Sequence, residues 1–143
     1  MTNPDEVSWI TGNVAITNFF SAHSKEVLAE HRVQAILCLD REAQGDAAEA
    51  RGVKCIELVH LVDGANEMVA FRNAVVALEE LVARWERVVV HCRAGRSRSI
   101  AVVAAYLKKA KALEADEALE LVRTKRESAV APELVRRVEL FED

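Results

Sequence analysis

Short apolar runs alternate along the chain with segments of helical periodicity. Three runs rich in Val, Ile and Leu predict strands. They cover residues 33–39, 53–59 and 88–90, and the first of them is expected to be buried. A further stretch, residues 9–17, turns at Gly12-Asn13 between apolar residues. This arrangement is typical of a hairpin of two short strands. The chain is therefore expected to build a sheet from several short strands.

Helical segments separate these strands. The clearest covers residues 67–85, where apolar side chains recur at spacings of three and four: Met68, Phe71, Val75, Leu78, Val82 and Trp85. The run from Ile100 to Leu107 is apolar on every side, which predicts a buried central helix. Ser24 can cap a short helix and Pro132 can open another. Shorter helices are expected over residues 24–31, 46–51, 115–126 and 132–141.

Strands that alternate with helices, followed by a helical C-terminal third, predict an α/β fold. The 143 residues are 51% apolar and show no repeat or linker, so one domain spanning residues 1–143 is expected. No apolar run approaches the ~18 residues of a membrane span, and no integral membrane segment is expected. A net charge of −4 argues against nucleic-acid binding, although it leaves room for a local basic site. The oligomeric state stays open.

The chain has three cysteines, an odd number without tight spacing, which fits neither a disulfide framework nor a zinc site. Reduced thiols and a cytoplasmic location are expected, since the polar N-terminus does not read as a signal peptide. Cys38 and Cys55 lie in predicted strands and should be buried. Whether either pairs with Cys92 on oxidation stays open. The histidines at 23, 31 and 60 have no metal-like spacing, and no metal or cofactor is expected.

The stretch HCRAGRSRS, residues 91–99, follows the last predicted strand and precedes the buried helix. We call it the signature loop. A loop at such a junction turns backbone N–H groups inward and lies at the positive end of the helix dipole, which suits a phosphate dianion and a thiolate. Five residues separate Cys92 from Arg98, so both can address one phosphorus atom, and Arg98 can grip two oxygens. Gly95 permits the tight curvature.

A buried structural cysteine beside solvated arginines is the alternative interpretation. However, the five fixed positions of His-Cys-x-x-Gly-x-x-Arg-Ser should coincide by chance on the order of once in 10⁵ chains. HCRAGRSRS resembles the signature of the protein tyrosine phosphatase superfamily, and its Ser-Arg-Ser ending is similar to dual-specificity phosphatases. The segment RAGRSRS also resembles mitochondrial-type phosphatidylglycerophosphate phosphatases.

The resemblance extends over nearly the whole chain, including Ala105-Tyr106-Leu107, the helix from Ala118-Leu119 to Arg126, and the end from Leu134 to Glu142. It implies a central mixed sheet of about five strands flanked by helices. One departure is Pro132-Glu133, where many members have Pro-Asn. A supporting hydrogen bond is therefore expected to be absent or replaced.

Cleaving a phosphate ester also needs a proton for the departing oxygen, usually from a carboxylic acid on a mobile loop. Asp63 is the best candidate, because it lies between the 53–59 strand and the long helix, where the resemblance places the general acid. Gly64-Ala65 would give the loop freedom to close. A solvated turn residue is the alternative for Asp63. Asp40 is interpreted as structural or as a pocket-rim residue, and Asn66 as the cap of the long helix.

Ser99 can donate a hydrogen bond to the Cys92 sulfur and help the thiolate leave when an intermediate is hydrolysed. A plain first-turn serine is the alternative. His91 is expected to fix the loop by hydrogen bonding, and the resemblance implies that it tunes the thiolate. The substrate phosphate is expected to bind the loop residues Arg93, Ala94, Gly95, Arg96, Ser97 and Arg98.

The sequence leaves the substrate open. Arg93 and Arg96 are either solvated or raise the local positive potential for a substrate with a second negative charge, such as phosphatidylglycerophosphate or a phosphoinositide. No basic amphipathic helix or lipid anchor accompanies them. Basic residues of the last two helices can form a membrane-facing surface or be ordinary helix charges: Arg123, Lys125, Arg126, Arg136 and Arg137.

The predicted function is a cysteine-dependent phosphomonoesterase of dual-specificity type. It would act on phosphotyrosine, phosphoserine and phosphothreonine through a phosphocysteine intermediate. A phospholipid phosphatase is the first alternative. A non-catalytic module that binds phosphorylated ligands and a sulfurtransferase with a persulfide on Cys92 are alternatives of other classes.

Overall fold

The computed structural model describes residues 6–41 and 48–142. Among these residues, five strands form one mixed sheet in the order β1-β2-β5-β3-β4. The hairpin predicted at residues 9–17 is present, with β1 antiparallel to β2. The other pairs are parallel, and β5 lies between β2 and β3. The strands are β1 (Ser8–Trp9), β2 (Val14–Thr17), β3 (Ala35–Cys38), β4 (Cys55–Leu58) and β5 (Val88–His91).

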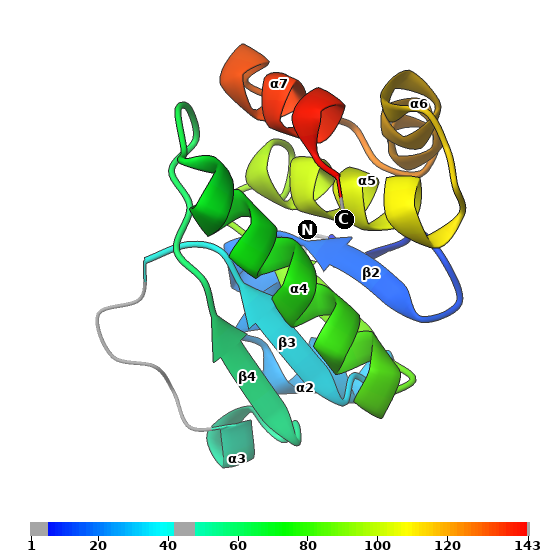
Figure 1. The fold of residues 1–143 in the computed structure, drawn as a ribbon. Coiled ribbons are helices and arrows are strands. Elements are labelled where there is room, and N and C mark those ends of the chain that lie inside the picture. The colour runs from blue at the N-terminus through cyan, green and yellow to red at the C-terminus, as the bar shows by residue number, and fades with distance from the viewer. Residues whose placement is uncertain (1–5, 42–47, 143) are drawn as a thin grey trace.

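Helices cover both faces of this sheet (Figure 1). Helices α4 and α5 pack on one face, and α6 and α7 pack against α5 as an outer layer. Helices α2 and α3 lie on the opposite face. The fold is therefore the α/β arrangement that the sequence predicts. The helices are α1 (Phe19–Ala22), α2 (Lys25–Glu30), α3 (Ala48–Arg51), α4 (Met68–Arg84), α5 (Arg98–Ala110), α6 (Ala115–Lys125) and α7 (Pro132–Leu140).

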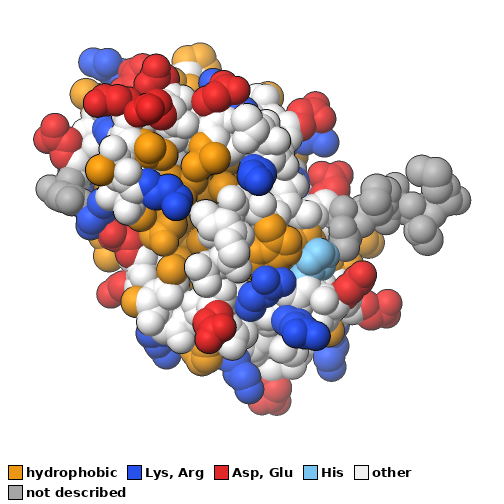
Figure 2. Space-filling view, turned by 90° about the vertical axis from the view of Figure 1, so that its right-hand side faces the viewer, with side chains coloured by type: hydrophobic (Ala, Val, Ile, Leu, Met, Phe, Trp, Pro, Cys, Tyr) orange, Lys and Arg blue, Asp and Glu red, His pale blue; other side chains and the backbone are white. Residues whose placement is uncertain are grey.

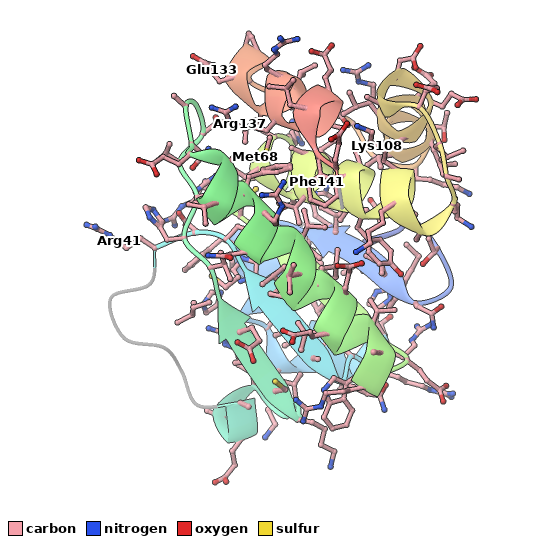
Figure 3. The ribbon with its side chains drawn as sticks, viewed as in Figure 1. Arg41, Met68, Lys108, Glu133, Arg137 and Phe141 are labelled. Atoms are coloured by element: carbon pink, nitrogen blue, oxygen red, sulfur yellow. The ribbon has the colours of Figure 1, made fainter. Side chains whose placement is uncertain are left out.

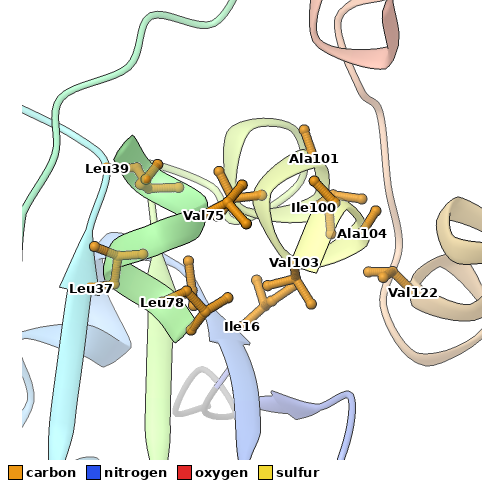
Figure 4. Close-up of a cluster of buried hydrophobic side chains, with 14 of the residues drawn as sticks. Ile16, Leu37, Leu39, Val75, Leu78, Ile100, Ala101, Val103, Ala104 and Val122 are labelled. Carbon is orange, nitrogen blue, oxygen red and sulfur yellow. The ribbon is translucent and has the colours of Figure 1, made fainter. Parts of the chain in front are cut away.

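The larger hydrophobic core lies between the sheet and helices α4 and α5 (Figure 4). Successive strand residues point to opposite faces, so Leu37 enters this core while Ile36 enters a smaller one on the α2 side. Burial on both faces explains why β3 and β5 read as continuous apolar runs. Fully buried members of the larger core include Ile16, Leu37, Leu39, Val75, Leu78, Ile100 and Val103.

The long predicted helix is present as α4, and its buried face is formed by Phe71, Ala74, Val75, Leu78 and Leu81. The prediction that Asn66 caps this helix is wrong. Glu67 occupies the N-cap position and makes no side-chain cap hydrogen bond. The amide of Asn66 is instead bonded to the preceding loop, at Val62 and Gly64.

Some local features differ from the prediction. Helix α1 was not expected, because four residues are too few to show periodicity; Asn18 caps it by accepting the N–H of Ser21 at 2.8 Å. Cys55 is only half-buried, because β4 is an edge strand. The first residues of the helix predicted over 46–51 lie outside the described residues, and α3 covers the rest.

The surface carries both signs of charge. On the face seen from the right of Figure 1, Lys and Arg side chains lie among Asp and Glu side chains, with apolar side chains near the middle (Figure 2). In the described part of the chain, no helix combines the length and the apolar character needed to cross a membrane.

Candidate active site

The signature loop joins the central strand β5 to the buried helix α5. Cys92 follows directly after β5, and its side chain lies within the larger core with 2% of the residue exposed. Arg98 is the first residue of α5. The hydroxyl of buried Ser99 donates a hydrogen bond to Cys92 Sγ over 3.0 Å. The fold therefore brings a sulfur, a hydroxyl donor and a helix N-terminus to one point at the C-terminal edge of the sheet.

Gly95 is the tightest point of the loop. Its φ of +72° lies in the left-handed region, which favours glycine. A Cβ at this position would also lie 2.8 Å from Arg126 Nη2 and still closer to the carbonyl oxygen of Thr17. The expectation that this position permits the loop curvature is thus matched by both its backbone angle and its surroundings.

Arg126, directly after α6, binds the outer side of the signature loop. Its Nε donates to Gly95 O over 2.5 Å, and Nη2 donates to Ala94 O over 3.1 Å. Nη1 also donates to Glu6 O and to Ser8 Oγ, at 2.9 and 3.0 Å. The carbonyls of Ala94 and Gly95 are therefore turned toward Arg126 and are not available to face a bound anion.

The burial of Arg126 corrects one sequence interpretation. Its side chain is only 5% exposed, so it does not belong to a membrane-facing surface. Burial lowers the pKa of Arg126, partly offset by the carboxylate of Glu6. Nothing in the sequence pattern distinguishes this arginine from the exposed Arg123, which lies on α6.

Asp40, at the end of β3, binds the two arginines that flank the loop. Arg98 Nη1 donates to Asp40 Oδ1 over 3.1 Å and to Leu61 O over 3.2 Å. Arg93 Nη2 lies 2.9 Å from Asp40 Oδ2. Burial acts to raise the pKa of Asp40, but the hydrogen bond and charge of Arg98, with the charge of Arg93, outweigh it and lower this pKa. The structural role expected of Asp40 is therefore specific, because its carboxylate orients the guanidinium of Arg98.

The structure brings Asp63 to the signature loop. Ser97 Oγ donates a hydrogen bond to Asp63 Oδ1 over 2.5 Å. Ser97 Oγ also accepts the backbone N–H of Ala131 over 3.0 Å. Asp63 is exposed, so it can meet a substrate above the loop. Ala131 directly precedes Pro132-Glu133, and this segment therefore supports the loop through its backbone.

His91 is fully buried beneath the loop. Its Nδ1 lies 3.2 Å from Cys92 O, and its ring meets the rings of Phe19 and His23 edge-on. The N–H of Phe19 donates to Arg93 O over 2.8 Å. These contacts agree with a role of His91 in fixing the loop. His31 accepts the indole N–H of Trp9, and His60 is exposed.

The two variable arginines of the loop both have carboxylate neighbours. Arg93, with its side chain 63% exposed, stacks over Phe19 at 4.4 Å from the ring centre while it pairs with Asp40. Arg96 Nη1 lies 3.5 Å from Glu127, and Arg96 Nη2 lies 3.8 Å from Glu6. The positive potential at the mouth of the loop is therefore partly compensated.

Neither of the other cysteines is placed to form a disulfide with Cys92. Cys38 is in register with His91, so its side chain points to the opposite face of the sheet from Cys92. Cys55 is level with Val88, roughly 13 Å along the strand direction from Cys92. All three are free. Among the described residues, no three His, Cys, Asp or Glu side chains gather in a possible metal site.

Comparison with known proteins places these residues in a family. The model of the dual specificity phosphatase catalytic domain matches residues 17–143. Protein-tyrosine-phosphatase IBR5 of Arabidopsis thaliana is 36% identical over 77 residues, 53% of this chain. Dual specificity protein phosphatase Mpk3 of Drosophila melanogaster is 26% identical over 126 residues, 87% of this chain. The chain spans 30% of the length of each of these two relatives.

Solved structures show the same fold. Human DUSP28 gives a TM-score of 0.80 at 22% identity, covering 96% of this chain and 93% of that chain. PTPMT1 in complex with PI(5)P gives 0.75 at 20% identity, covering 94% and 93%. At these identities the likeness concerns the fold alone, a mixed sheet flanked by helices. Because the family model matches residues 17–143, which are most of this chain, the chain belongs to the dual-specificity phosphatase family and carries the catalytic domain of that family.

Proposed function

We propose that the chain is a cysteine-dependent phosphomonoesterase that acts on phosphotyrosine, phosphoserine and phosphothreonine in proteins. The observation that carries this proposal is the position of Cys92 Sγ, which accepts a hydrogen bond from Ser99 at the floor of the signature loop. A hydroxyl donor to the sulfur and a helix N-terminus beside it both stabilise negative charge that develops there. An inert core cysteine would need neither.

In the first step, the Cys92 thiolate attacks phosphorus and forms an S–P bond, while the P–O bond to the leaving oxygen breaks. Asp63 gives its proton to that oxygen, so an alcohol or phenol departs. The N–H groups of the loop and the guanidinium of Arg98 stabilise the charge on the three transferring oxygens, which is the larger part of the catalysis.

In the second step, water attacks the phosphocysteine. Asp63, now ionised, takes a proton from this water, the S–P bond breaks, and inorganic phosphate leaves. The electron pair of that bond returns to Cys92 as a thiolate. Ser99 stabilises this leaving thiolate through its 3.0 Å hydrogen bond.

The ion pairs that Arg93 and Arg96 form with carboxylates favour a protein substrate over a polyanionic lipid. Arg93 and Arg96 would supply the charge for a second phosphate, but each already has a carboxylate within 4 Å. A phospholipid phosphatase is the second candidate, supported by the exposure of Arg93 at the mouth, and one structural neighbour was solved with PI(5)P.

The test measures phosphate release by the purified chain from phosphotyrosine peptides, phosphothreonine peptides and phosphatidylglycerophosphate vesicles. We expect release from peptides by the wild type and none by Cys92→Ser, which should still bind them. Release from vesicles alone would assign the lipid function. Binding of peptides without release by the wild type would indicate a binding module, and formation of thiocyanate from thiosulfate and cyanide would indicate a sulfurtransferase.

A further inference from the structure

The loop that carries Asp63 is closed by the side chain of Asn66. We call residues 61–67 the acid loop. Asn66 Oδ1 accepts the N–H of Val62 over 2.8 Å. Asn66 Nδ2 donates to Val62 O over 2.8 Å and to Gly64 O over 3.1 Å. One amide thus binds the residue before Asp63 and the residue after it, using most of its hydrogen-bonding capacity.

The acid loop is also held from outside at both ends. At its start, the N–H of buried Leu61 donates to Leu39 O over 3.0 Å, and Leu61 O accepts Arg98. At its end, Arg137 Nε donates to Asn66 O over 2.7 Å. Figure 3 shows Arg137 reaching from α7 toward the start of α4 at Met68. Between these ends, Asp63 meets the signature loop through Ser97.

The sequence predicts that Gly64-Ala65 gives the acid loop freedom to close, and the structure adds the contacts that hold the loop in the conformation seen here. In the structure Asp63 already contacts the signature loop, and a Cβ at Gly64 would meet nothing within 4 Å. The conformation of the acid loop is therefore supported by hydrogen bonds of Asn66 rather than by a requirement for glycine.

We propose that Asn66 is a positioning residue, which holds the acid loop so that the Asp63 carboxyl stands ready to protonate the leaving oxygen, with Arg137 as a second anchor. This inference rests on the proposed function of Asp63. General acid catalysis contributes roughly 10²–10⁴-fold and depends on geometry. Loss of the Asn66 amide should therefore reduce the protonation step and leave thiolate attack largely intact.

The test compares Asn66→Ala with the wild type on two substrates. Phenyl phosphate has a poor leaving group that needs a proton, whereas p-nitrophenyl phosphate has a good one. We expect kcat for phenyl phosphate to fall by about 10-fold or more and kcat for p-nitrophenyl phosphate to fall far less, with KM nearly unchanged. Asp63→Ala is the reference and should show the same selectivity to a greater degree.

Equal losses on both substrates, or no loss, would overturn the role of Asn66. A wild type that turns over neither substrate would instead refute the proposed function. If Asp63→Ala lost kcat equally on both substrates, Asp63 would not be the general acid, and the role proposed for Asn66 would fall with it. Arg137→Ala is the second variant, for the case in which Asn66→Ala does not fold. Its kcat should fall more on phenyl phosphate than on p-nitrophenyl phosphate, but by less than in Asn66→Ala. Arg136 is exposed and pairs with Glu139, so Arg136→Ala is the control and should behave as wild type. An unselective Arg137→Ala would count against the anchor.

Discussion

Asp40 places a single carboxylate between two arginines of the signature loop. The sequence shows an aspartate at the end of a strand, which is common and carries no signal of this role. Its effect comes from its position two residues after β3, the neighbour of β5, which sets it opposite Arg98 and Arg93. Without it, these two guanidinium groups would lose the carboxylate that they share.

The pKa of Asp40 leads to a prediction of stability against pH. Its pKa in the folded state lies below the unfolded value of about 3.9. Ionised Asp40 therefore stabilises the fold above that unfolded pKa, and this stabilisation is lost as pH falls through the folded pKa. We expect Asp40→Asn to lower the free energy of unfolding at pH 7 by about 1.5–3 kcal/mol. Urea unfolding at pH 7 and at lower pH values measures it.

The difference between Asp40→Asn and the wild type should shrink once pH falls below the unfolded pKa of Asp40. Glu120→Gln, an exposed carboxylate on α6, is the control and should have little effect at any pH. A difference that is absent at pH 7, or that stays constant down to acidic pH, would contradict the role assigned to Asp40.

At the scale of elements, the signature loop depends on the close approach of Gly95 to Thr17 and Arg126. We expect Gly95→Ala to lower the free energy of unfolding by at least about 1–3 kcal/mol, because of its left-handed backbone. It should also remove most of the activity, since the loop must shift to accommodate a Cβ. Denaturant unfolding and phosphate release measure the two effects.

Gly12→Ala is the matched control for Gly95→Ala. Gly12 lies in the hairpin turn, and a Cβ there would meet nothing within 4 Å. It should change stability and activity little. A Gly95→Ala protein as stable and active as Gly12→Ala would show that the loop tolerates a side chain at this position.

The sequence predicts best what is contiguous along the chain. Strand β5, the signature loop and α5 follow one another, so Cys92, Arg98 and Ser99 could be recognised as one group before their contacts were known. The bond from Arg126 to Gly95 spans 31 residues and depends on how α6 packs on α5. The cap assigned to Asn66 was wrong because the competing partners, in the preceding loop, satisfy its amide better.

At the scale of the whole molecule, Arg126 ties α6 to the N-terminal segment, to β2 and to the signature loop. Its guanidinium contacts Glu6, Ser8, Ile16, Ala94 and Gly95. Replacing it by an apolar residue leaves the loop carbonyls without this donor, while Glu6 keeps Arg96 as a neighbour. A buried acceptor left without its hydrogen-bond partner typically costs about 1–3 kcal/mol.

We therefore expect Arg126→Met to lower the free energy of unfolding by at least about 1–3 kcal/mol. Urea unfolding at neutral pH measures it. Arg123→Met, one turn earlier on α6 and exposed, is the control and should stay within about 0.5 kcal/mol of wild type. Equal stability of the two variants would mean that the buried guanidinium is not a structural centre of the fold.

The central claim is that Cys92 carries the phosphoryl group between substrate and water. Rapid denaturation of the enzyme during turnover of a phosphate-labelled substrate should trap a phosphoenzyme, and peptide mapping by mass spectrometry should assign the phosphate to Cys92. We expect label on Cys92 in the wild type, with no label and no turnover in Cys92→Ser. Full turnover by Cys92→Ser, or label on another residue, would contradict it.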